Sequence, residues 1–155
     1  SNMKFALNGA LTIGTLDGAT VEMADRIGKE NLFLFGLSAQ EVAERRAAGW
    51  RGEQAVEASD TLREVLDAVA GGVFSPDDRG RYHDLVASLR AEDWFMVAAD
   101  FDSYLAAQKD AMTLYRDNQA WRRKAVLNTA GMGWFSADRS IAEYAADIWK
   151  VPVSP

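Results

Sequence analysis

The sequence predicts an α/β fold in which a short parallel βαβ unit precedes a mostly helical chain. Two observations support this prediction. Residues up to about 37 are punctuated by glycines and contain two short runs of apolar, β-branched and aromatic side chains. From residue 38 onward, helix-start and helix-stop signals follow one another in close succession. We therefore divide the chain into a βαβ segment, residues 1–37, and a helical portion, residues 38–155.

The βαβ segment is predicted from two apolar runs with a short helix between them. The runs cover residues 10–14 and 32–35, and continuous apolar runs of this length are typical of strands buried on both faces. Between them, Thr20 is placed to cap a helix that ends at Gly28. Because a two-stranded parallel sheet is marginal by itself, the pattern suits a piece of a larger α/β sheet.

Polar caps and glycines mark the helices that follow. Ser38 and Glu41 have the spacing of a capping box, for a helix that stops near Gly49. Apolar residues spaced i, i+3, i+4 and i+7 predict a helix over residues 62–69. The Ser-Pro pair at residues 75–76 is typical of an N-cap followed by proline in the first helical position, and it predicts the next helix start.

The rest of the chain is predicted as one short strand followed by three helices. The strand covers residues 94–99, and Asp100 is expected to cap the helix after it. Another helix starts after Asn118. The last helix starts near Ser136 and stops before Pro152, and the residues expected to face inward on it are Ile141, Tyr144, Ala145 and Ile148.

Composition and charge exclude several classes of protein. The 155 residues are 48% hydrophobic, which is enough for a packed core, and their net charge of −6 disfavours nucleic acid and anionic membranes as partners. The chain has no cysteine, which excludes disulfides, and its single histidine leaves no histidine-rich metal site. With no apolar run of about 18 residues and no signal peptide, the composition predicts a soluble, cytoplasmic protein.

Taken from the residues alone, the chemical signals are weak. Lys4 lies in a short predicted helical turn, and it is either a solvated charge or, inside a closed apolar pocket, an amine that can form a Schiff base. The loop at residues 14–18 is either a tight turn or a ligand cradle at the end of a strand. His83 and residues 136–139 are interpreted as a structural histidine and a capped helix start.

The stretch NMKFALNGALTIGTLDGA, residues 2–19, resembles the cofactor segment of the glycogen (α-glucan and maltodextrin) phosphorylases. The similarity continues through residues 30–36, 72–76 and 135–149, so it covers essentially the whole chain. A mild departure is Thr20, where many relatives have asparagine. The chain is similar to roughly the last fifth of such an enzyme, beginning at the lysine motif.

The resemblance implies that the chain is the carboxyl-terminal part of a GT-B, Rossmann-like domain. Lys4 matches the lysine that holds pyridoxal phosphate as a Schiff base, and Asn2 is a weaker candidate for contact with that cofactor. In the family the cofactor's phosphate group serves the reaction, which makes Lys4 a tether. No metal is implied. Ser1 either belongs to the turn that holds the cofactor phosphate or is not native.

The resemblance also implies a function for the parent enzyme. Glycogen phosphorylases cleave terminal α-1,4-glucosidic bonds with inorganic phosphate and release glucose 1-phosphate, and the parent is expected to be a homodimer. No complete catalytic site is expected within these residues. The chain alone is therefore expected to be inactive, to hold pyridoxal phosphate weakly or not at all, and to self-associate. The alternative from another class is a non-catalytic helical interaction module.

Overall fold

The computed structural model describes residues 2–152, so the expectation about Ser1 lies outside the described residues. The chain is mostly helical and divides into two compact units. The first unit comprises residues 2–14, 18–34 and 110–152, and the second comprises residues 15–17 and 35–109.

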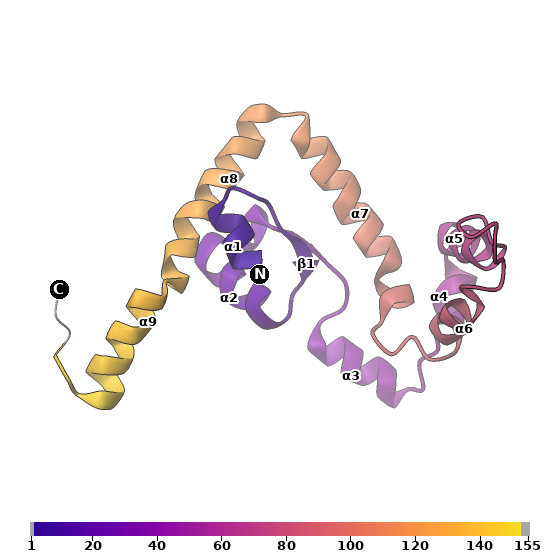
Figure 1. The fold of residues 1–155 in the computed structure, drawn as a ribbon, viewed down its shortest axis with the longest axis horizontal. Helices are drawn as coiled ribbons and strands as arrows, with labels where there is room; N and C mark the ends of the chain where they lie inside the picture. Colours follow the sequence, from indigo (N-terminus) through magenta and orange to yellow (C-terminus); the bar gives the residue numbers. More distant parts are fainter. Residues whose placement is uncertain (1, 153–155) are drawn as a thin grey trace. The chain divides into compact units, whose positions relative to one another are not determined.

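The first unit is built around the long helix α8, Asn118–Met132, and Figure 1 shows α1 and α2 lying against it. Asp117 caps α8 by accepting hydrogen bonds from the backbone of Gln119 and Ala120. The other elements of this unit are α1 (Asn2–Leu7), α2 (Gly18–Ile27), the 3-10 helices η1 (Lys29–Asn31) and η2 (Gly133–Phe135), α9 (Ala137–Glu143) and the π-helix η3 (Tyr144–Trp149).

The core of the first unit is mainly apolar and includes one fully buried asparagine. Its buried apolar side chains include Ala6 of α1, Met23 of α2 and Met132 of α8. Asn128 of α8 is 0% exposed, and its Nδ2 donates to the carbonyl oxygens of Asn31 and Lys124, each at 2.9 Å. The bond to Asn31 fastens α8 to the end of η1, and the bond to Lys124 lies within α8 itself. A buried amide that lost these bonds would pay its full desolvation cost.

The sheet is smaller than the sequence predicts. Its two parallel strands are β1, Ile13–Thr15, and β2, Phe33–Phe35, instead of residues 10–14 and 32–35. All six strand residues are half-buried, so the expectation of burial on both faces was wrong. The described residues supply no third strand, and short strands without further neighbours are the expected result.

The second unit is a cluster of helices around its own core. Figure 1 shows α4, α5 and α6 gathered together, and their packed side chains include Val56, Leu62 and Val86. The helices are α3 (Ala39–Ala47), α4 (Glu53–Ala58), α5 (Asp60–Ala70), α6 (His83–Ala91) and α7 (Val97–Tyr115), the last of which continues into the first unit.

The capping box of α3 is confirmed. The backbone N–H of Ser38 donates to Glu41 Oε2 at 2.7 Å, and the N–H of Glu41 donates to Ser38 Oγ at 3.3 Å. The hydrogen bonds with Ser38 also lower the pKa of the Glu41 carboxyl group. This helix start was predictable because its determinants are only three residues apart.

The predicted helix start at Ser75–Pro76 was wrong. Residues 71–82 form successive turns, and α6 begins at His83. The Ser75 side chain is fully buried, and its Oγ has no hydrogen-bond partner among the described residues, so it caps nothing. The Asp78 carboxylate instead accepts from the backbone of Gly80 at 3.1 Å, an Asx-type turn that competes with helix.

The predicted strand at residues 94–99 and the predicted cap at Asp100 were also wrong. Asp93 and Met96 have positive φ angles of 40° and 56°, which no strand allows, and α7 begins at Val97. The carboxylate that caps α7 belongs to Asp93. Asp93 Oδ1 accepts from the N–H of Ala98, and Asp93 Oδ2 accepts from that of Ala99, both at 3.0 Å.

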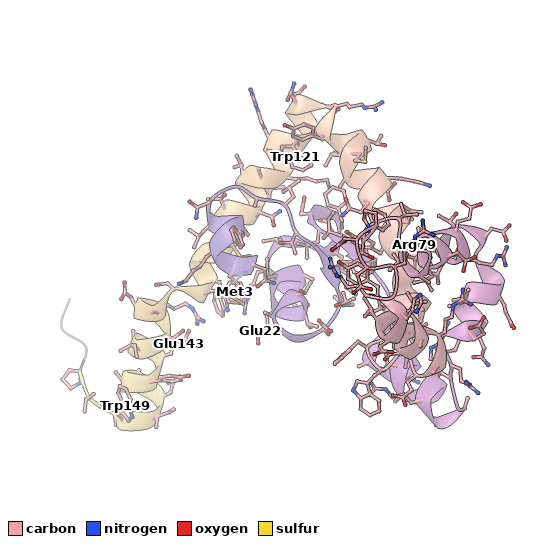
Figure 2. All side chains as sticks on the ribbon, turned by 45° about the vertical axis from the view of Figure 1, so that its right-hand side comes forward. Met3, Glu22, Arg79, Trp121, Glu143 and Trp149 are labelled. Atoms are coloured by element: carbon pink, nitrogen blue, oxygen red, sulfur yellow. The ribbon has the colours of Figure 1, made fainter. Side chains whose placement is uncertain are left out.

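The last helix starts after Ser136 as predicted, but most of its predicted inward face is exposed. Ala145 is buried, whereas Ile141, Tyr144 and Ile148 are exposed. Figure 2 shows Glu143 and Trp149 along this helix. A helix packs its apolar stripe only where another surface meets it, and the described part of the chain offers none here.

None of the helices within residues 2–152 is both long enough and apolar enough to cross a membrane.

Candidate cofactor site

Lys4 lies on the exposed side of α1, and the opposite side of that helix packs on α8. Ala6 is fully buried, and its carbonyl oxygen accepts a hydrogen bond from Thr129 Oγ1 of α8 at 3.1 Å. Figure 2 labels Met3 on the same turn. The packing of α1 on α8 therefore fixes the backbone at Lys4 while the side chain remains in solvent.

Both ends of α1 are closed by local hydrogen bonds. Asn2, which is half-buried, accepts from the backbone N–H of Met3 at 3.1 Å through its Oδ1. At the other end, Asn8 Nδ2 donates to the carbonyl oxygen of Lys4 at 2.8 Å, and Gly9 follows with a φ of 83°. Glycine tolerates this left-handed conformation, so it suits the position after the helix.

The described residues around Lys4 are compatible with a lysine that binds pyridoxal phosphate covalently. The Lys4 amine lies on an exposed helix face, where it is accessible to the cofactor's aldehyde, and the helix that carries it is anchored. The side chains of Phe5 and Leu7 beside it are also exposed. In the chain as described, Lys4 is thus a solvated lysine, and its neighbours do not enclose it.

Residues 14–18 are only partly a loop, because Gly14 and Thr15 belong to β1 and only residues 16–17 form a bend before α2. Gly18 has a φ of 45°, a conformation that favours glycine, and α2 begins at that residue. Thr20, expected to precede and cap this helix, lies within it and is buried. A Cβ added to Gly14 would meet the Thr20 Oγ1 at 3.6 Å, an ordinary contact.

The two other polar candidates have structural roles. His83 Nε2 lies 3.0 Å from the carbonyl oxygen of Ala70, which joins the start of α6 to the end of α5. Ser136 precedes α9, and Arg139 forms an ion pair with Glu143 one turn along the same helix. The structural interpretation of His83 is confirmed. Residues 136–139 are a helix start as predicted, but the predicted cap was wrong, because the Ser136 side chain accepts no hydrogen bond from α9.

A carboxylate that the sequence pattern did not single out as a site lies in the second unit. Asp100 Oδ1 accepts from the backbone N–H of Leu37 at 2.9 Å. Burial raises the pKa of the Asp100 carboxyl group, and the charges of Asp93 and Asp17 act in the same direction. The Leu37 hydrogen bond and Arg45 act against them. The sequence signal available for Asp100 was its position near a helix start, and that signal pointed to capping.

Metal-ligand clusters are absent from the part of the chain that the structure describes. No group of three or more His, Cys, Asp or Glu side chains within residues 2–152 is arranged to hold a metal ion.

Comparison with known proteins places the chain in a family. The model of the carbohydrate phosphorylase family matches residues 1–151. Glycogen phosphorylase from Pasteurella multocida is 46% identical over 151 residues, which is 97% of this chain and 18% of that protein. The brain form from Mus musculus is 44% identical over 153 residues, 99% of this chain and 18% of that protein.

A glycogen phosphorylase from Synechocystis is 45% identical over 150 residues, 97% of this chain. Relatives from two bacterial groups and a mammal thus align over almost the whole chain, which spans 18% of their own length. With a family match from residue 1 to residue 151, the chain belongs to the carbohydrate phosphorylase family.

Proposed function

We propose that this chain is the part of a glucan phosphorylase that carries the cofactor lysine. The parent enzyme would use inorganic phosphate to cleave terminal α-1,4-glucosidic bonds of glycogen or maltodextrin and release glucose 1-phosphate. The observation that carries the proposal is the collinear match over residues 1–151 to a family whose relatives are named glycogen phosphorylase. The short parallel βαβ arrangement is compatible with the carboxyl-terminal part of a GT-B domain.

Within that enzyme, Lys4 would hold pyridoxal phosphate covalently through its Nζ. When bound, the cofactor supplies a phosphate group that exchanges protons with the substrate phosphate. Lys4 would keep the cofactor in place without moving a proton itself, and α8 would support it by fixing α1 through the Thr129 hydrogen bond. Asn2, at the start of α1, is the weaker candidate for a contact with the cofactor.

The same proposal covers organisation and partners. We assign residues 1–37 to the βαβ segment with the cofactor lysine, and residues 38–155 to the helical portion with the last helix. The parent would be a cytoplasmic homodimer that binds glucan and phosphate and neither nucleic acid nor membrane. The exposed apolar side chains of the last helix, among them Ile148 and Trp149, support self-association of the isolated chain.

Reductive trapping tests the role of Lys4. The chain is incubated with pyridoxal phosphate, reduced with borohydride and digested, and the modified peptides are quantified by mass spectrometry. We expect a label at Lys4, because its amine is exposed. We also expect that label to be lost on dialysis before reduction, since Phe5 and Leu7 do not enclose the amine. The matched control is Lys29, another lysine of the first unit. A label that survives dialysis at Lys4 and disappears in Lys4→Ala would show a more complete site than we propose.

A turnover assay tests whether the chain is catalytic by itself. With maltodextrin and inorganic phosphate, we expect no glucose 1-phosphate above the background of a Lys4→Ala sample. The physical reason is that a tether contributes orientation alone, whereas the rate of phosphorolysis depends on groups that hold both substrates. Sustained production of glucose 1-phosphate that Lys4→Ala abolishes would contradict the proposed inactivity and would place the full site within this chain.

A further inference from the structure

A cavity in the second unit is lined mainly by aromatic and aliphatic side chains. Its volume is about 380 Å³, and its walls include Phe35, Phe95, Val97, Phe101 and Tyr104. The rings of Phe35 and Tyr104 stand edge to face, with centroids 5.1 Å apart and planes at 63°. These two rings therefore form two walls that meet at a corner.

The aromatic walls are accessible to a ligand. Phe95 is 82% exposed and Val97 is 54% exposed, although both are large apolar side chains at one cavity. Phe101 is half-buried and packs against the core of the unit, which gives the cavity a fixed side. Neither Phe95 nor Val97 contributes to that core, so the packing of the unit does not account for their position.

The polar part of the lining is the hydroxyl-bearing Thr15 and one carboxylate, that of Asp100. Its Oδ1 is held by the N–H of Leu37 at 2.9 Å. Gly36, with a φ of 82°, makes room for the other oxygen, because a Cβ at residue 36 would lie 2.6 Å from Asp100 Oδ2. The carboxylate is therefore positioned at the cavity by two backbone features of the segment that follows β2.

The charge near Asp100 is predominantly negative. Asp93 and Asp17 are close enough to raise the pKa of its carboxyl group, and Arg45 is the cation that acts against them. A negative field beside exposed ring faces disfavours anions. It favours a cation, which gains both from the carboxylate and from the electron-rich faces of the rings.

We propose that this cavity binds a small organic ammonium ion that carries apolar substituents. The substituents would lie against Phe35, Phe95 and Tyr104, and the positive charge would lie beside Asp100. The volume lies within the usual range of small-molecule sites, and the lining is mostly apolar with one charged group that orients the ligand. This site is separate from the role of Lys4 and does not depend on the proposed function.

Ligand-observed NMR with choline tests the proposal. The neutral comparison is 3,3-dimethylbutan-1-ol, which has the same shape with carbon in place of the charged nitrogen. We expect saturation transfer and an upfield ring-current shift of the choline N-methyl protons, and binding of the alcohol weaker by about tenfold, since its methyl groups gain apolar contact alone. Equal binding of the two probes, or binding of neither, would overturn the proposal.

Two substitutions locate the binding. Asp100→Asn keeps an oxygen that can accept from Leu37 but removes the charge, and Phe95→Leu removes an exposed ring. Each is expected to weaken choline binding by about tenfold. The matched controls are Asp147→Asn, which makes the same charge change in the first unit, and Phe74→Leu, which replaces an exposed ring outside the cavity lining. Equal losses in the controls, with all variants folded by circular dichroism, would mean that choline binds elsewhere.

Discussion

Replacing Gly52 by alanine is expected to destabilise the second unit by about 3 kcal/mol, at the high end for an overpacked site. Gly52 precedes α4, and a Cβ built on it would clash with the carbonyl oxygen of Leu89 in α6. Backbone atoms cannot rotate away as a side chain can. The alanine methyl group must therefore separate α4 from α6, and the contacts of Val56 and Val86 in the shared core weaken.

Urea unfolding followed by tryptophan fluorescence measures this effect, since Trp50 and Trp94 lie in the same unit as Gly52. Gly133→Ala is the matched control. Gly133 has a helical φ of −56°, and a Cβ there would meet no atom within 4 Å. We expect that variant to be unchanged or more stable by about 0.5 kcal/mol, because alanine restricts the unfolded chain. A Gly52→Ala chain as stable as Gly133→Ala would refute the close packing of α4 on α6.

Features with local determinants were predicted from the sequence. The capping box of Ser38 and Glu41 depends on residues three positions apart. The helix predicted to start after Asn118 starts one residue earlier, at Asn118, behind a capping Asp117. The order of strand, helix and strand was also predicted correctly. In each case the side chains that decide the structure are neighbours along the chain, so the pattern contains the necessary information.

Features that depend on tertiary contacts were missed. Ser75 looks like an N-cap, but its hydroxyl is buried in a turn. The apolar residues after Asp93 have the composition of a strand. They begin a helix instead, because the Asp93 carboxylate accepts hydrogen bonds from the backbone of its first turn. Apolar spacing alone does not reveal which side chains find a surface to cover them. For this reason Ile141 was expected to be buried and is exposed.

The two candidate sites differ in the same way. Lys4 was singled out through a resemblance carried by a continuous stretch of sequence, and its place on α1 needed only local structure. The cavity at Asp100 combines Phe35 with Phe95 and Tyr104, which lie 60 or more positions further along the chain. No pattern in the sequence joins these segments, because the packing of the second unit brings them together.

Replacing Asp93 by alanine is expected to destabilise the second unit by about 4 kcal/mol, since it leaves buried donors without an acceptor. The carboxylate is 1% exposed and accepts three hydrogen bonds, from the backbone of Ala98, the backbone of Ala99 and Trp50 Nε1, the last at 3.2 Å. Two of these donors belong to the first turn of α7, which has no other intrahelical partners for them. Leaving buried donors unpaired costs about 1–3 kcal/mol each.

The backbone conformation at Asp93 makes a second contribution to the expected destabilisation, and a control variant separates it from the loss of the hydrogen bonds. Its φ of 40° is tolerated by asparagine and aspartate better than by alanine, and best by glycine. Asp93→Gly therefore removes the three hydrogen bonds without the conformational cost, whereas Asp93→Asn keeps the conformation and one acceptor oxygen. We expect the loss in free energy of unfolding to be smallest for Asp93→Asn, larger for Asp93→Gly and largest for Asp93→Ala. Urea unfolding with Trp50 fluorescence as the probe measures it. If Asp93→Gly were as stable as the unchanged chain, the hydrogen bonds would contribute nothing and α7 would be held in place by the burial of Ala98 alone.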